Sequence, residues 1–119
     1  MFIGEVAKIT GLSVKAIRLY EEKGLIRVPP RSGRYRIYNK TDIEILNLIV
    51  EAKKLGVTLA SLKDVIVYKD NSPDWLRIKS FLIEIKAKLF EQKQEIDKRI
   101  KLVDSCILQI EDDVVKAPL

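Results

Sequence analysis

Basic and aromatic side chains cluster in the first forty residues, at spacings that suit contact with a polyanion. Lys15 and Arg18 are close enough in sequence for a helix to present both on one face. A lysine ammonium can donate to guanine O6 or N7 or to a phosphate, and an arginine guanidinium pairs well with phosphate oxygens. This pattern predicts contact with a nucleic acid. A second basic and aromatic group follows it: Arg31, Arg34, Tyr35, Arg36 and Tyr38.

The chain around the first basic group has the residues of a helix-turn-helix. We expect one helix over residues 3–10 and a second over residues 13–23. Ala7 is small enough for the two helices to approach closely, and Gly11 gives the backbone the freedom for a tight turn. Ile17 is expected to anchor the second helix in the core. These elements predict a motif that holds its second helix in the major groove of duplex DNA.

The start of the second helix supplies the predicted base contacts. Ser13 is a good N-cap, and Ser13, Val14 and Lys15 enter the groove first. Lys15 suits either a guanine or a phosphate, and the sequence does not choose between them. Arg18 lies one turn further and suits a backbone phosphate. Tyr20 is apolar with a polar tip, so a core position and a phosphate contact both remain open.

The second basic group is predicted to form a β-hairpin wing. We expect strands over residues 25–28 and 35–38, with a Ser-Gly turn between them and two prolines ending the first strand. Strand alternation places Arg34 and Arg36 on one face and Tyr35 on the other. Because backbone contacts position a protein while base contacts specify the site, these residues are expected to set affinity more than sequence preference.

The charge distribution supports the same interpretation. Residues 1–40 contain nine lysines and arginines against three glutamates, a net charge of +6. The other 79 residues carry thirteen positive and fourteen negative charges, a net charge of −1. The positive field is therefore concentrated on the predicted DNA-binding segment.

The rest of the chain is predicted to be helical. Helices are expected over 41–55 (capped by Thr41 or Asn39), 58–68 and 74–111, with a break at 69–73. This organisation predicts a DNA-binding domain with a second helix pair, a dimerisation helix and a C-terminal tail, over residues 1–70, 71–111 and 112–119.

The long helix carries an apolar stripe at alternating steps of four and three residues. Its core members are Leu82, Ile85, Leu89, Ile96 and Val103. Nothing later in the chain is available to cover this stripe, so it is expected to pack on another chain or on the head. A two-chain coiled coil, and therefore a homodimer, is the natural solution.

Three stretches of the chain resemble the MerR family of transcriptional regulators: IGEVAKITGLSVKAIRLYEEKGLI (3–26), YRIYNKTDIEILNLI (35–49) and AKKLGVTLASLKDVI (52–66). The resemblance implies a mainly all-α fold with a winged helix-turn-helix head, a second helix pair and a long helix that forms an antiparallel coiled coil. It also implies a palindromic promoter site that the dimer distorts, RNA polymerase as a partner, and wing residues Arg36 and Tyr38 gripping phosphates.

Two residues depart from the family pattern. Leu19 takes the first place of a usual tyrosine pair, and Arg34 stands where a glycine usually precedes Tyr-Arg. We expect one phosphate contact to be lost at Leu19 and another to be gained at Arg34, with overall docking retained.

No cofactor or metal site is predicted. Metal sensors of this family use cysteines near the start of the long helix and in a loop after it, whereas this chain has one cysteine, Cys106, and no histidine. A soft-metal site needs at least two thiolate or imidazole ligands. Cys106 is therefore only a weak metal candidate, and packing in the apolar stripe suits it better.

The sequence shows no enzyme, membrane span or signal peptide. The acidic pair Glu21–Glu22 has no nucleophile or phosphate loop beside it and is expected to be solvated surface. A lone cysteine suits the cytoplasm. Two alternatives remain: an excisionase-like or architectural DNA-bending protein, which would not need the long helix, and a coiled-coil interaction protein whose basic head is incidental. Salt-dependent binding to duplex DNA would separate the last from the others.

Overall fold

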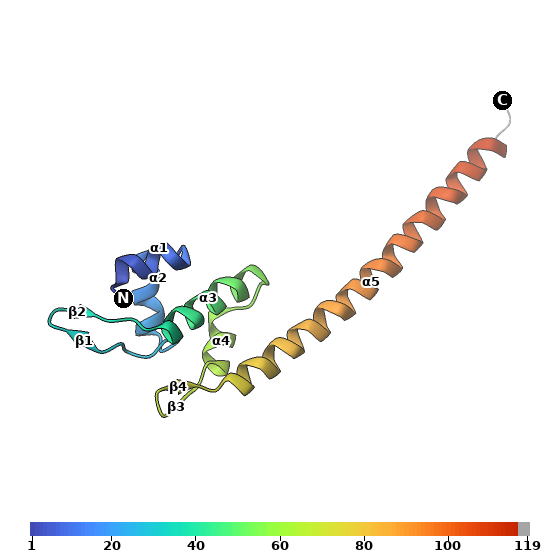
Figure 1. Ribbon diagram of the computed structural model, residues 1–119. Coiled ribbons are helices and arrows are strands. Elements are labelled where there is room, and N and C mark those ends of the chain that lie inside the picture. Colours follow the sequence, from blue (N-terminus) through green and yellow to red (C-terminus); the bar gives the residue numbers. More distant parts are fainter. Residues whose placement is uncertain (117–119) are drawn as a thin grey trace. The chain divides into compact units, whose positions relative to one another are not determined.

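The computed structural model describes residues 1–116, which form helices and two short antiparallel hairpins (Figure 1). Residues 117–119 of the predicted tail lie outside the described residues. The mainly helical fold with a small wing and a long C-terminal helix is confirmed. The elements are α1 (Ile3–Thr10), α2 (Val14–Glu22), β1 (Arg31–Ser32), β2 (Tyr35–Arg36), α3 (Lys40–Lys54), α4 (Leu59–Val65), β3 (Tyr68–Lys69), β4 (Ser72–Pro73) and α5 (Trp75–Lys116).

The chain divides into two compact units. The first, which we call the head, comprises Met1–Ile78, and the second begins at Lys79. The first turn of α5 belongs to the head because Ile78 is buried there. The division therefore lies between residues 78 and 79, later than the 70/71 boundary expected from the sequence.

The helix-turn-helix forms as its residues predict. Gly11 ends α1 with a φ of 74°, in the left-handed region, and its N–H donates to the Ala7 carbonyl at 2.9 Å. Ser13 caps α2, because its Oγ accepts from the Ala16 N–H at 3.0 Å. Ile17 has no exposed surface. The turn and the core contact together fix the direction in which α2 leaves α1.

Helix α3 begins with a reciprocal capping box, and Asn39 rather than Thr41 is the cap. Asn39 Oδ1 accepts from the Asp42 N–H at 2.9 Å, and Asp42 Oδ2 accepts from the Asn39 N–H at 2.8 Å. Arg27 Nε and one terminal nitrogen donate to the same carboxylate at 2.9 and 3.1 Å. Asp42 therefore ties the segment that follows α2 to the start of α3.

The wing forms, but its first strand lies elsewhere than predicted. Arg31 pairs with Arg36, and Ser32 pairs with Tyr35. The predicted strand over 25–28 is wrong: Leu25 and Ile26 are buried core residues, and the Leu25 N–H donates to the Tyr20 carbonyl as part of the end of α2. The two prolines that follow have no N–H to donate, so strand pairing begins only after them.

The segment predicted as a helix end and a break is a second hairpin. Helix α4 ends at Val65, and Ile66 is extended. Strands β3 and β4 then pair through Asp70 and Asn71, whose φ angles of 52° and 61° suit a tight two-residue turn. The helix predicted to reach residue 68 therefore stops three residues earlier.

Helix α5 continues beyond its predicted end at residue 111 as far as Lys116, so residues 112–116 of the predicted tail are helical. Lys116 Nζ donates to Asp112 Oδ2 at 2.9 Å, an i,i+4 pair that supports the last turn. From Lys79 to Lys116 no residue is buried, and only Phe81 and Ile85 are partly covered. Of the predicted dimerisation residues, Leu82, Leu89, Ile96 and Val103 are therefore exposed in the single chain, and Ile85 is partly covered.

Candidate nucleic-acid interface

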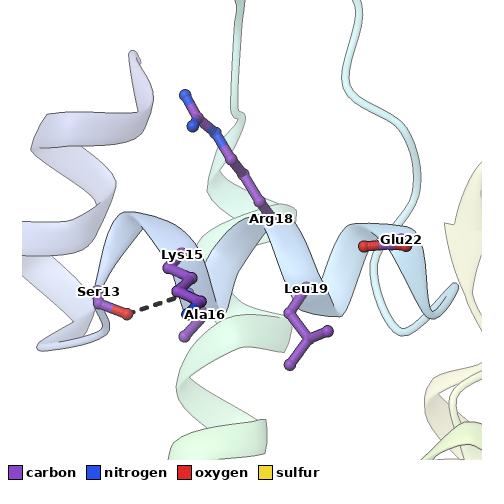
Figure 2. A pocket seen from close by; sticks show the side chains of 6 residues that line it. All are labelled: Ser13, Lys15, Ala16, Arg18, Leu19 and Glu22. Atoms are coloured by element: carbon purple, nitrogen blue, oxygen red, sulfur yellow. Dashed lines mark hydrogen bonds between the residues drawn. The ribbon is translucent and has the colours of Figure 1, made fainter.

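The exposed face of α2 carries a shallow hollow of about 500 Å³ (Figure 2). Lys15 lies on this face, and Figure 2 shows Arg18 and Leu19 leaving the helix on different sides. The positive charges of Lys15 and Arg18 therefore lie at the edge of a partly apolar, solvent-exposed surface. The lining residues are Ser13, Lys15, Ala16, Arg18, Leu19 and Glu22.

The opposite face of α2 packs into the head. Ile17 and Tyr20 are buried, and so is Glu21, which is only 8% exposed. Of the two roles left open for Tyr20, burial favours the core position. Glu21 corrects the expectation that the Glu21–Glu22 pair is solvated, because only Glu22 is exposed.

The wing presents most of its predicted residues to solvent. Arg31, Arg34 and Tyr35 are exposed, and the Tyr35 ring lies 5.6 Å from that of Phe2, centroid to centroid. This aromatic contact joins the tip of the wing to the N-terminal residues of the head.

Arg36 and Tyr38 face inward to different degrees. Arg36 Nε lies 2.7 Å from Glu21 Oε1, while its side chain stays 31% exposed. Tyr38 is buried, and among the described residues its hydroxyl has no hydrogen-bond partner. Burial, helped by the nearby Glu21 carboxylate, raises the pKa of Tyr38. The hydroxyl is thus held neutral in the core, and a direct phosphate contact by Tyr38 does not fit this position.

Two acidic residues lie buried in the head although sequence reasoning placed neither of them in the core. Asp42 and Glu21 are both buried acidic residues paired with an arginine, Arg27 and Arg36 respectively. The signal for Asp42 was present in its place three residues after Asn39, which is the capping-box spacing. The signal for Glu21 was its place four residues after Ile17, which puts it on the buried face of α2, whereas Glu22 lies off that face.

A family model described as MerR HTH family regulatory protein matches residues 1–69, which is more than half of the chain. The chain belongs to the MerR family of helix-turn-helix regulators. It is accordingly a DNA-binding transcriptional regulator of the MerR type and not an enzyme.

Relatives cover nearly the whole of this MerR-family chain. The transcriptional regulator CueR of Vibrio cholerae is 33% identical over 119 residues, covering 99% of this chain and 81% of that protein. A probable heavy metal-dependent transcriptional regulator of Haemophilus influenzae is 34% identical, covering 89% and 88%. The structure of the N-terminal part of MtaN, the multidrug transporter activator of Bacillus subtilis, matches with a TM-score of 0.61 and 26% identity, covering 91% of this chain and 98% of that one.

One relative is named as heavy metal-dependent, which raises the question of whether the residues of this MerR-family chain fit a metal site. Residues 1–116 contain no group of three or more His, Cys, Asp or Glu side chains that could hold a metal ion. Cys106 is exposed on α5. A single thiol without imidazole partners does not meet the needs of a soft metal, so the described residues of one chain do not fit such a site.

Within the described part of the chain, no helix has the length and apolar character needed to span a bilayer.

Proposed function

We propose that this regulator binds a palindromic promoter site as a homodimer and distorts the DNA between the two half-sites. In this proposal residues 1–70 hold the DNA and residues 71–111 dimerise. The observation that carries it is the contrast between the two faces of α2: one is fully used by the core, and the other is exposed and basic. RNA polymerase at the promoter is the proposed partner, and the cytoplasm the proposed compartment.

The proposed DNA contacts are the predicted residues that remain exposed or partly exposed. Ser13, Val14 and Lys15 at the start of α2 approach the major groove, and Arg18 approaches the backbone. Tyr20 and Tyr38 are omitted because both are buried. The wing contributes Arg31, Arg34, Tyr35 and Arg36.

Dimerisation through α5 is supported by the exposure of its apolar stripe. Leu82, Leu89, Ile96 and Val103 are all more than one third exposed in the single chain. Leaving such a stripe in water is unfavourable, since each buried leucine or isoleucine side chain contributes roughly 1.5–3 kcal/mol. A second α5 helix would cover it. No metal cofactor forms part of the proposal.

Alanine substitutions should separate the backbone contact from the base contact. Arg18→Ala should weaken binding to all duplexes about equally and reduce the slope of log affinity against log salt by roughly one phosphate contact. Lys15→Ala should instead relax preference at particular base pairs, by roughly 1–3 kcal/mol if the contact is a good one. Fluorescence anisotropy on a panel of duplexes at several salt concentrations measures both. An unchanged affinity for Arg18→Ala at moderate salt would show that the head is wrongly placed on DNA.

The distortion of the site should appear as a preference for flexible DNA at its centre. Two palindromic sites with identical half-sites but different central base pairs should differ in affinity, because a bend costs less in a deformable centre. The test first obtains the site by selecting genomic fragments with the purified protein, and then compares a pyrimidine–purine centre with a stiff A-tract. Equal affinity for both centres would rule out the proposed distortion while leaving DNA binding intact.

A further inference from the structure

The wing and the end of α2 meet through a single ion pair. Arg36 comes from strand β2 and Glu21 from α2, and their side chains approach to 2.7 Å between Nε and Oε1. The Glu21 side chain is 7% exposed, whereas that of Arg36 is 31% exposed. The carboxylate is thus held inside the head, and the guanidinium bridges from it toward solvent.

The outer part of Arg36 opens into a hollow of about 430 Å³ that Arg18 also lines. The two arginines come from different elements, α2 and β2, yet both border the same space. Arg36 Nε is buried against Glu21. Among the described residues, no hydrogen bond engages the terminal guanidinium nitrogens of either arginine, so these donors remain available to an anion. A phosphate is the anion that suits two guanidinium groups. The other lining residues are Glu21, Glu22 and Val28.

A buried carboxylate beside a phosphate site has two opposing effects. Its charge repels the phosphate and weakens binding. Its contact with Arg36 restricts the rotamers of a long side chain that would otherwise lose that freedom on binding, and this strengthens binding. Because a Glu21 carboxylate oxygen lies 2.7 Å from the buried Arg36 Nε, the ordering effect acts directly on the Arg36 side chain.

We infer that Glu21 is a positioning residue, which holds Arg36 in the orientation that lets Arg36 and Arg18 grip the same DNA backbone phosphate. This inference rests on the proposed placement of the head on DNA. Glu21 then strengthens DNA binding, whereas its negative charge alone would weaken it.

A double-mutant cycle between Glu21 and Arg36 tests the inference. Glu21→Ala should weaken binding to a fixed duplex by about tenfold in the wild-type background, but by less than about twofold in the Arg36→Ala background. Glu21→Gln, which keeps the side-chain shape and one oxygen acceptor, should lose less than Glu21→Ala. Equal losses in both backgrounds, or tighter binding by Glu21→Ala, would overturn the inference.

Glu22→Ala is the matched control. Glu22 is adjacent to Glu21 and has the same charge, but it is exposed, and no ion pair joins it to another side chain of residues 1–116. Because Glu22 lines the same hollow without an ion pair to Arg36, its removal should raise affinity slightly, since only repulsion is lost. A tenfold loss with Glu22→Ala would mean that truncating an acidic side chain at this end of α2 weakens binding whether or not it contacts Arg36, and it would overturn the role assigned to the Glu21–Arg36 contact.

Two further measurements separate the possible failures. Thermal unfolding of each variant shows that binding is compared between folded proteins, and if Glu21→Ala does not fold, the same cycle is run with Glu21→Gln, where a loss confined to the Arg36-containing background is again expected. If the wild type itself fails to bind duplex DNA, the proposed function is wrong. If it binds and Arg36→Ala weakens binding but the cycle shows no coupling, only the role of Glu21 is wrong.

Discussion

Leu89→Asp should convert the protein from a dimer to a monomer at micromolar concentration. Leu89 lies in the middle of the α5 apolar stripe and is 44% exposed in the single chain. A two-fold pair of helices would bury two aspartates at this position, and an uncompensated buried charge costs about 3–5 kcal/mol. We therefore expect dimerisation to weaken by at least a factor of roughly 100. Sedimentation equilibrium measures the change, and affinity for a palindromic duplex should fall with it.

Gln94→Asp is the control for this result. Gln94 is exposed on the same helix. It lies five residues after Leu89, and this spacing places it on the side of the helix away from the stripe. The substitution adds the same charge outside the predicted contact between the helices, so the dimer should persist. If the wild type sediments as a monomer, or if both variants behave alike, α5 is not the dimerisation surface.

Asp42→Ala should strongly destabilise the head. The carboxylate is 1% exposed and accepts hydrogen bonds from Arg27 and from the Asn39 backbone. Removing it leaves the guanidinium of Arg27, itself only 20% exposed, without its partner, and removes one of the two hydrogen bonds of the capping box of α3. Breaking such a pair costs about 3–5 kcal/mol, a large part of the roughly 5–15 kcal/mol that stabilises a typical domain. Urea unfolding followed by circular dichroism measures the shift.

Glu44→Ala provides the comparison for Asp42. Its partner Lys40 is 4.0 Å away, and both side chains are well exposed. Such a pair contributes little, so we expect a change within about 0.5 kcal/mol. A loss for Asp42→Ala no larger than that for Glu44→Ala would show that the Arg27–Asp42 contact does not hold the head together.

The features that the sequence predicts well are those set by neighbouring residues. Ser13, Asn39 and Thr58 each cap the helix that follows, through side-chain bonds to an N–H three residues on. Gly11 takes the left-handed conformation that its turn requires. In each case the relevant groups lie within one turn of chain, so local physical chemistry decides the outcome.

The features that the sequence predicts poorly depend on contacts between distant segments. Leu25 and Ile26 were predicted to lie in a strand but are buried core residues outside any strand. The hairpin through Asp70 is anchored where the Tyr68 hydroxyl donates to the Leu25 carbonyl at 3.4 Å. Burial of Tyr68 raises its pKa to about 12, so this donor keeps its proton. Neither contact has a signature within its own segment.

The same limit applies to the candidate site. Exposure of Lys15 and Arg18 follows from helical periodicity, because Ile17 and Tyr20 mark the buried side of α2. The ion pair between Glu21 and Arg36 does not follow from helical periodicity, since it joins α2 to a strand that begins thirteen residues after the helix ends. Which predicted wing residues touch DNA stays a prediction.

The two faces of α2 have separate roles, and this separation affects how regulators of this kind diverge. Lys15, Ala16 and Leu19 face outward, whereas Ile17, Tyr20 and Glu21 hold the helix in the head. Substitutions at the outward positions leave the core unchanged, so they cost the fold little. Under the proposed placement of α2 on DNA, a duplicated copy of this gene could acquire a new operator through a few such exchanges, with its stability and its dimer partner retained. Recognition of new promoters and maintenance of the scaffold are thus separable targets for natural selection and for engineering.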